Sequence, residues 1–301
     1  MSVKKPAISV LCVTFNHENF IKDALEGFVS QQLNVPFEVL VGDDCSTDGT
    51  SSVIRKYASQ YPHIIKPILH KENIGASRNF ASLVRRIQGK YVALCDGDDY
   101  WTDTLKLQKQ YDFLESFPDY SMCFHLVRQS YDDGSQPDIL YGPGHYLPDV
   151  VTSRNYFKLA DLLRINVIAS LSVLYRWKMG NTLPEWMLKY NICDLPIHLI
   201  HADIGKIGYI DEEMGTYRKH ARGSWWNHET PAHKKENSAR YISLLEDINA
   251  SLNYRNESDF RAIINVSKIE LAKLQGDKSP FYRVLSSKLA YAIRILRQRC
   301  S

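Results

Sequence analysis

Residues 93–101 read ALCDGDDYW, in which the aspartates Asp96, Asp98 and Asp99 follow directly after an apolar run. That run, residues 91–95, is short and ends in polar residues, which predicts a buried strand. Like charges placed this close repel each other, and a dry setting makes each charge more costly. A bound divalent cation would compensate the carboxylates. The stretch therefore indicates a metal site at the end of a strand.

Apolar runs alternate with helical spacing through the first third of the chain. Strands are expected at residues 8–15, 37–41, 64–69 and 91–95, and helices between them at residues 18–32, 51–61 and 77–87. This alternation predicts an α/β fold with a mainly parallel central sheet and helices on both faces. Ligands of such sheets bind beyond the carboxyl ends of the strands.

Polar clusters follow three of these strands: TFNHE at residues 14–18, GDDCSTDGT at 42–50 and DGDDYW at 96–101. The second cluster also suits a helix N-cap, through Asp44, Ser46 or Thr47. It is not a calcium loop of the EF-hand type, because Arg55 stands where a bidentate Glu is needed. The sequence has no glycine-rich phosphate loop. Carboxylates that hold Mg²⁺ or Mn²⁺ are therefore expected to neutralise phosphates.

Composition excludes several classes of protein. The net charge of +3 over 301 residues is too small to indicate nucleic acid as the partner. No apolar run reaches the length of a membrane span, and the N-terminal run is too short for a signal peptide. The six cysteines show no zinc-site spacing. These features favour a protein of the reducing cytoplasm.

The later chain departs from the alternation. A helix at residues 105–117 is expected to precede a strand at 121–131, hairpins or a loop over the site at 132–149, and helices at 154–163 and 194–204. Beyond Trp226 the chain is polar and helical, with a break at residues 276–280. We therefore expect a catalytic domain at residues 1–228 and a helical C-terminal region at residues 229–301.

The last residues have the pattern of a basic amphipathic helix. No acidic residue follows Asp277, and a helix from Pro280 would place apolar side chains on one side and arginines on the other. This pattern is typical of a helix that lies on an anionic membrane surface. The alternatives are a helix packed on the catalytic domain and a contact between two subunits.

The order of TFNHENF, GDDCSTDGT, the NIG and RN stretches within residues 73–79, and DGDD resembles the family 2 glycosyltransferases of the GT-A fold. The resemblance covers about residues 8–220. It implies a metal-dependent enzyme that moves a sugar from a nucleoside diphosphate donor, expected to be UDP-based, with inversion at the anomeric carbon. The acceptor would be a hydroxyl of a saccharide or lipid-linked saccharide, in the assembly of a surface polysaccharide or glycoconjugate.

The resemblance also implies roles for residues on the donor side. Thr14 and Asn16 match residues that line the nucleotide pocket, and Asp44 matches the acid that contacts the base or ribose. Asp96 and Asp98 match the two ends of the D-x-D motif. The first of these faces the ribose or the metal, and the second binds the Mn²⁺ or Mg²⁺ ion that bridges the diphosphate.

Further roles are implied for three residues, each with a plainer alternative. Arg78 matches an arginine near the nucleotide, or is a solvated charge on a helix. Asp194 matches the acid that serves as general base, or caps the helix that contains Pro196. The familiar variant has two acids here, so Cys193 is a departure. TYRKH resembles the family's Y-R-x-H segment, which implies that His220 completes the metal coordination; the alternative is a surface histidine.

Two other functions compete with glycosyl transfer. A sugar nucleotidyltransferase would need a glycine-rich first loop with Arg or Lys, and TFNHENF has neither. A non-catalytic nucleotide-sugar-binding module would not require Asp96, Asp98 and Asp194 together. The expected location is the cytoplasm, with the tail as a means of attachment to the inner face of the cell membrane. The oligomeric state is left open.

Overall fold

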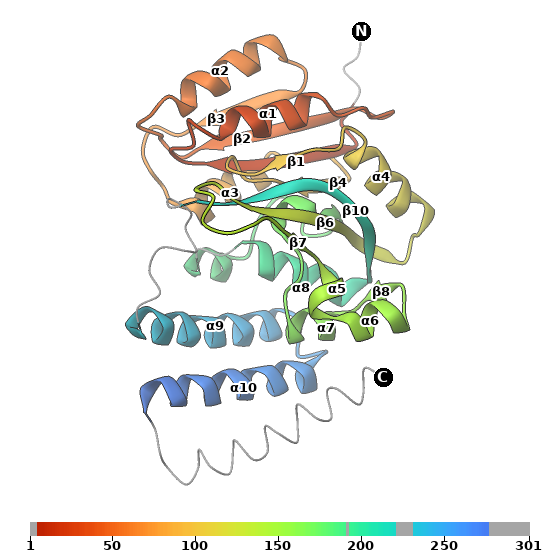
Figure 1. The fold of residues 1–301 in the computed structure, drawn as a ribbon, viewed down its shortest axis with the longest axis vertical. Helices are drawn as coiled ribbons and strands as arrows, with labels where there is room; N and C mark the ends of the chain where they lie inside the picture. Colours follow the sequence, from red (N-terminus) through yellow and green to blue (C-terminus); the bar gives the residue numbers. More distant parts are fainter. Residues whose placement is uncertain (1–4, 191–192, 221–230, 277–301) are drawn as a thin grey trace.

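The computed structural model describes residues 5–190, 193–220 and 231–276. Its strands are β1 (Ile8–Thr14), β2 (Phe37–Asp43), β3 (Ile65–Leu69), β4 (Tyr91–Leu94), β5 (Tyr100–Trp101), β6 (Tyr120–Tyr131), β7 (Ile139–Tyr141), β8 (Tyr156–Phe157), β9 (Leu174–Arg176) and β10 (Lys206–Lys219). They form one mixed sheet in the order β3-β2-β1-β4-β9-β6-β10-β5, with β7 paired to β6 and β8 paired to β10 (Figure 1).

The first four strands confirm the predicted parallel part of the sheet. β1 pairs in parallel with β2 on one side and with β4 on the other, and β2 pairs with β3. Side chains of β1 alternate between the faces, so Val10 and Cys12 enter one core and Leu11 enters the other. Burial on both faces explains why β1, β2 and β4 read as nearly continuous apolar runs.

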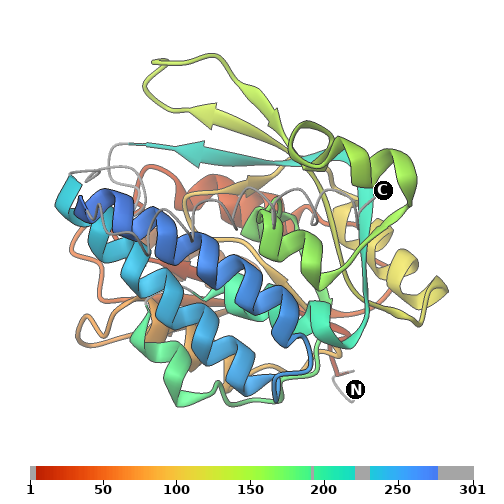
Figure 2. The same ribbon diagram turned by 90° about the horizontal axis from the view of Figure 1, so that it is seen from below.

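Helices cover both faces of the sheet. They are α1 (Ile21–Val29), α2 (Thr50–Gln60), α3 (Ala76–Val84), α4 (Lys106–Ser116), α5 (Pro143–Tyr146), α6 (Pro148–Ser153), α7 (Leu159–Arg164), α8 (Asp194–Ile204), α9 (Pro231–Ser251) and α10 (Glu257–Gln275), with 3₁₀ turns η1 (Ser170–Ser172) and η2 (Glu185–Lys189). α1, α2 and α4 share a core on one face, and α3, α7 and α8 share the other. Figures 1 and 2 show α9 and α10 side by side as an outer layer below α8.

Parts of the second half differ from the sequence-based expectation. The helix expected at residues 154–163 is shorter, because residues 156–157 form β8 against β10 and only α7 follows. The turn-rich stretch contains β7, which forms a hairpin with β6, and then the short helices α5 and α6. The helix expected beyond Trp226 is interrupted between α9 and α10, where Asn253 and Tyr254 adopt positive φ.

The helical C-terminal region shares a core with the rest of the chain. Leu245 of α9 and Phe260 of α10 belong to the same apolar cluster as Leu162 of α7 and Ile197 of α8. The predicted boundary at residue 228 and the basic tail lie outside the described residues, so the division into two parts stays a prediction. Among the described residues, no helix is both long and apolar enough to cross a membrane.

Candidate active site

A cavity of about 320 Å³ opens at the carboxyl ends of β1, β2 and β4. Its lining includes four of the predicted site residues, Thr14, Asp44, Asp96 and Asp98, together with the side chain of His17. A volume of this order is typical of small-molecule sites. The three polar clusters therefore meet at one site, because β1 lies between β2 and β4 in the sheet.

The loop after β1 is shaped by Asn16. This residue adopts a positive φ of 56°. Its side-chain oxygen accepts the backbone N–H of Thr47 at 2.8 Å, and its own N–H donates to Ser46 Oγ at 2.9 Å. Asn16 thus ties the first loop to the second and is not among the residues that line the cavity. Thr14 does line it, and its buried hydroxyl has no partner among the described residues.

Asp44 holds a third segment against the site. Its two carboxylate oxygens accept the backbone N–H groups of Ile74 at 2.8 Å and Gly75 at 2.9 Å. Gly75 has a φ of 84°, which favours glycine. The helix after Asp44 begins at Thr50, with Gly49 at the N-cap position and no side-chain cap, so Asp44 is not a helix cap. Arg78 lies exposed on α3 and does not line the cavity.

The aspartates of DGDD differ in their surroundings. Burial, and then the charges of Asp98 and Asp194, raise the pKa of Asp96 to about 8. Burial would also raise the pKa of Asp98, but a hydrogen bond from His220 and the charge of His17 bring it below its ordinary value. Asp98 is therefore an anion, and the region around Asp96 resists a second negative charge unless a cation is bound.

Asp99 binds a backbone N–H group and is not among the residues that line the cavity. It is buried, and it accepts the backbone N–H of Arg218 at 2.9 Å. The guanidinium of Arg218 donates to the backbone carbonyl of Asp98 at 3.3 Å, pairs with Asp23 and lies 4.3 Å from the ring centre of Tyr100. Arg218 thus fixes the DGDD turn between α1 and β10. Arg218 stands within TYRKH, but the sequence alone predicts no role for it.

Two histidines face Asp98. His220 Nε2 lies 3.0 Å from Asp98 Oδ2 and His17 Nε2 lies 3.7 Å from it, while the Nδ1 atoms of both rings have no partner among the described residues. His220 is buried, so it is not a surface histidine. Burial lowers the pKa of His17, which favours its neutral form at pH 7. His17 was not singled out in the sequence, although it stands within TFNHE.

These residues fit a divalent ion that also has ligands from the substrate. Within the described ranges, no three or more His, Cys, Asp or Glu side chains are placed to hold a metal by themselves. Mn²⁺ and Mg²⁺ commonly use one or two carboxylates and take phosphate oxygens and water for the rest. Asp98, with Asp96 and the imidazole of His220 beside it, supplies a donor set of that kind.

Asp194 approaches the same acids from α8. Its Oδ2 accepts a hydrogen bond from Ser170 Oγ at 3.0 Å, and α8 has no side-chain cap, so the capping alternative is wrong. Its charge contributes to the raised pKa of Asp96, which places it on the DGDD side of the fold. Burial raises the pKa of Cys193 to about 12, so this thiol does not replace the second acid. Ser170 carried no recognisable signal in the sequence.

Comparison with known proteins agrees with this geometry. The family model described as glycosyl transferase family 2 matches residues 9–168. The chain belongs to this family. A protein of Mycobacterium tuberculosis with no assigned function is 38% identical over 225 residues, which are 72% of this chain and 60% of that protein. This family 2 glycosyltransferase chain thus spans less than two thirds of that relative's length.

Solved structures share the fold of this glycosyltransferase. Staphylococcus aureus TarS in complex with UDP matches with a TM-score of 0.54 and 18% identity, over 97% of this chain and 90% of that chain. A curated TarS, poly(ribitol-phosphate) beta-N-acetylglucosaminyltransferase, is 34% identical over 101 residues, or 33% of this chain and 17% of that protein. The mannosyltransferase PcManGT from Pyrobaculum calidifontis, with GDP-Man and Mn²⁺, matches with a TM-score of 0.54 and 16% identity, over 99% and 84% of the two chains. The predicted GT-A fold is confirmed.

Proposed function

We propose that this family 2 enzyme transfers a sugar from a nucleoside diphosphate donor, of the UDP type, to an acceptor hydroxyl with inversion. The observation that carries the proposal is the meeting of Asp96 and Asp98 in the cavity at the strand ends; Asp194 of α8 is not among the residues that line this cavity, but its charge raises the pKa of Asp96. The donor is supported by structural neighbours that were solved with UDP and with GDP-Man and Mn²⁺.

On the donor side, Thr14 and Asp44 would contact the nucleoside, and Asn16 would keep the first loop in the shape that admits it. Asp98 and His220 would hold Mn²⁺ or Mg²⁺, with Asp96 facing the ribose or the ion. When bound, such an ion stabilises the negative charge that develops on the departing diphosphate. Arg78 would add an exposed positive charge at the rim.

On the acceptor side, Asp194 would act as general base. Its carboxylate would take the proton of the acceptor hydroxyl while that oxygen forms a bond to the anomeric carbon of the donor sugar. The bond from this carbon to the diphosphate oxygen breaks in the same displacement, which inverts the configuration. The hydrogen bond from Ser170 would orient the carboxylate for this role.

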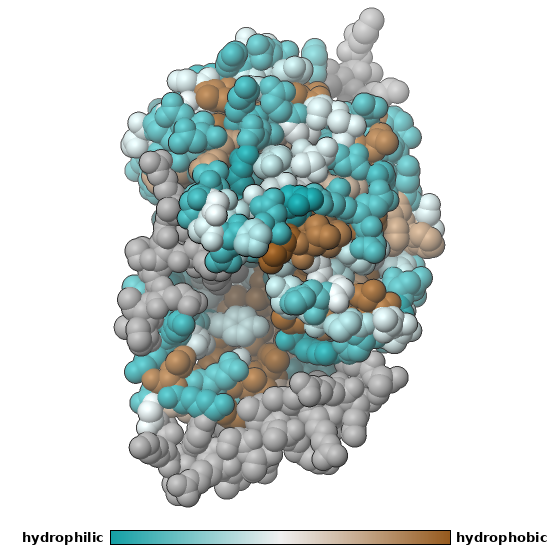
Figure 3. Space-filling view, viewed as in Figure 1, coloured by the Kyte–Doolittle hydropathy of each residue, from teal (hydrophilic) through white to brown (hydrophobic). Residues whose placement is uncertain are grey.

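The surface beside Asp194 supports a lipid-linked saccharide as acceptor. Burial, Tyr146 and the charge of Asp194 raise the pKa of Tyr141 to about 12, so the end of β7 lies near the base. Ile139 and Leu140 of the same strand are 44% and 53% exposed, and Figure 3 shows an apolar patch over this hairpin. Liposome flotation of the full chain, compared with a chain ending at Asp277, tests attachment to anionic membranes; equal binding of both contradicts a role of the tail.

A donor screen tests the proposed reaction. UDP-glucose, UDP-galactose, UDP-GlcNAc and GDP-mannose are incubated with Mn²⁺ and a panel of saccharide acceptors, and nucleoside diphosphate release is measured. We expect release from a UDP sugar, its loss with EDTA, and an inverted anomeric centre by NMR. Exchange of pyrophosphate into the donor would instead indicate a nucleotidyltransferase. Donor binding without release, with every acceptor, would indicate a binding module.

A further inference from the structure

The charged residues of this chain are unevenly distributed. Residues 55–90 hold eight of the 37 lysines and arginines but only one of the 34 acidic residues, Glu72. The rest of the chain, with 29 basic and 33 acidic residues, is therefore net negative. Residues 55–90 contain the second half of α2 and all of β3 and α3, so the excess of positive charge belongs to one part of the fold.

Most of these cations are not matched by a carboxylate. Lys90 pairs with Glu115 at 2.7 Å, and the guanidinium of Arg86 donates to the backbone carbonyl of Ser82 at 2.6 Å. The remaining six cations, defined here as the basic edge, are exposed and form no ion pair within the described part of the chain: Arg55, Lys56, Lys66, Lys71, Arg78 and Arg85.

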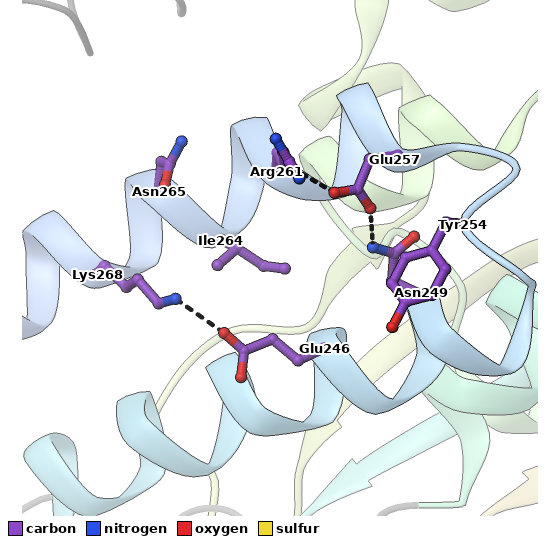
Figure 4. A pocket seen from close by; sticks show the side chains of 8 residues that line it. All are labelled: Glu246, Asn249, Tyr254, Glu257, Arg261, Ile264, Asn265 and Lys268. Carbon is purple, nitrogen blue, oxygen red and sulfur yellow. Dashed lines mark hydrogen bonds and ion pairs between the residues drawn. The ribbon is translucent and has the colours of Figure 1, made fainter.

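The outer helices at the opposite end of the molecule show the contrast. Figure 4 shows the cavity between α9 and α10, where Lys268 lies 2.8 Å from Glu246 and Arg261 pairs with Glu257. Each of these cations has a carboxylate from the same pair of helices. The unmatched cations of the basic edge indicate instead an anionic partner outside the described chain.

The cations of α2 lie at the end of the sheet. β3 is the terminal strand of the sheet, and α2 packs against it. Tyr57 of α2 points toward α1, where its hydroxyl donates to Glu26. Arg55 lies two residues earlier, just over half a turn around the helix, and is therefore on the side of α2 away from α1. Figure 1 shows α2 and β3 at the end of the molecule opposite α9 and α10.

The cations of α3 lie near the same strand. His70 directly follows β3, and its Nε2 atom lies 3.2 Å from Ser82 Oγ of α3. Arg78 and Arg85 come four residues before and three residues after Ser82, so they share its side of the helix. Lys71 follows His70 in the chain. The basic edge thus gathers around β3, from α2 on one face of the sheet and α3 on the other.

We propose that the basic edge docks on an anionic lipid bilayer, as a contact separate from the one proposed for the C-terminal tail. Each basic residue close to such a surface strengthens the binding. A polyanionic strand is instead usually held in a positively charged groove. None of the six cations lines the cavity at the strand ends or the cavity between α9 and α10. Exposed cations spread over two helices and a strand suit a planar anionic surface better.

Docking of this kind would bring the bilayer close to the candidate active site. Asn73 and Gly75 stand between Lys71 and Arg78 in the chain, and both line the cavity at the strand ends. The docking itself does not depend on the proposed transfer reaction, because neither donor nor metal takes part in it.

Flotation of the full chain with two kinds of vesicle tests the docking. One kind is phosphatidylcholine alone, and the other is equal parts of phosphatidylcholine and phosphatidylglycerol. We expect the wild type to bind only the anionic vesicles, and more weakly at high salt. Arg55→Glu/Lys56→Glu, on α2, should weaken this binding by at least about tenfold, because two attractions become repulsions. Lys71→Glu/Arg85→Glu, on the α3 side, should do the same.

A control variant makes the same change of charge elsewhere. Arg240→Glu/Lys273→Glu alters exposed residues of α9 and α10. It should bind within about threefold of the wild type, because exposed charges are screened beyond about 10 Å. All three variants keep the tail, and all should keep the wild-type Tm because the substituted side chains are exposed.

Several results would overturn the proposal. These are no binding of the wild type to anionic vesicles, unchanged affinity of either edge variant, and an equal loss in the control variant. Duplex DNA and polyglutamate serve as further probes. Tighter binding of either polymer than of the anionic vesicles would assign the basic edge to a polyanionic chain instead. Since turnover is not measured, failure here is distinct from failure of the proposed transfer reaction.

Discussion

The proposed donor side and the proposed acceptor side of the site are built in different ways. The donor side uses the ends of β1, β2 and β4, which are adjacent in the sheet and each carry a polar motif in sequence. The acceptor side joins α8, the 3₁₀ turn that contains Ser170, and the hairpin of β7, which lie far apart along the chain. Regular parallel strands bring motifs together by topology alone, whereas irregular segments depend on specific tertiary contacts.

The two sides also differ electrostatically. On the proposed donor side, a hydrogen bond from His220 helps to bring the pKa of Asp98 below its ordinary value, while burial raises the pKa of Asp96. Asp194 on the proposed acceptor side accepts a hydrogen bond from a neutral group, the hydroxyl of Ser170. This division suits a cation on one side and a free base on the other.

The largest expected effect comes from the donor side. Asp98→Ala should abolish the dependence of donor binding on Mn²⁺ and lower turnover by at least about a thousandfold, since a bound metal supplies several kcal/mol of charge stabilisation. Nucleotide release and titration with UDP measure the two quantities. Asp112→Ala, an exposed acid of α4, is the matched control. UDP binding by Asp98→Ala with an unchanged Mn²⁺ requirement would show that the metal lies elsewhere.

The acceptor side is tested by Asp194→Asn. The amide keeps an oxygen for the hydrogen bond from Ser170 and removes the basicity, so turnover should fall by about 10²–10⁴ while the Kd for UDP stays the same. Ser170→Ala, which leaves the base in place, should lose far less. If Asp194→Asn retained more than about a tenth of the wild-type rate, Asp194 would not be the base.

Lys106, at the start of α4, permits a test of the scaffold beneath DGDD. Burial lowers its pKa from 10.5 to about 7, and its Nζ lies 3.9 Å above the ring of Trp101. The unfolded chain stays protonated up to the higher value, so the buried amine destabilises the fold fully below pH 7 and not at all above pH 10.5. Lys106→Met should therefore raise the free energy of unfolding by up to about 4 kcal/mol at pH 6.

That difference should shrink as the pH rises toward 10.5. Urea unfolding at several pH values measures it, with the partly exposed Lys109→Met as control. A stability gain that does not change with pH would mean that Lys106 is not neutralised in the native state. If Lys106→Met also keeps its activity at pH 7, Lys106 supports the fold and takes no part in the reaction.

The smallest effect is expected at Arg78. The side chain is exposed and outside the cavity, and a surface cation contributes about 1 kcal/mol or less. Arg78→Ala should raise the KM for the donor by no more than about fivefold, less so at high salt, and leave kcat unchanged. A hundredfold loss would show instead that Arg78 closes over the bound donor.

Much of the proposed donor side could be predicted from the amino-acid sequence alone. The apolar run before Asp96 predicts a buried strand, and the polar residues that follow it mark the end of the strand where a ligand would bind. Both signals are local, because they depend only on the order of neighbouring residues. Asn16 and Asp44 were assigned to the site through the family resemblance. Their hydrogen bonds to neighbouring loops were not expected, since these join residues about thirty positions apart.

The rest depended on how the chain packs. Whether Asp194 caps a helix or faces the acids is undetermined in the sequence, since both fit an aspartate before Pro196. In the structure α8 has no side-chain cap, and the charge of Asp194 raises the pKa of Asp96. The same holds for His17 and Arg218, whose neighbours come from distant segments. Local chemistry thus indicated an anionic strand end that needs a cation. Which side chains surround it follows from long-range packing that a linear pattern does not encode.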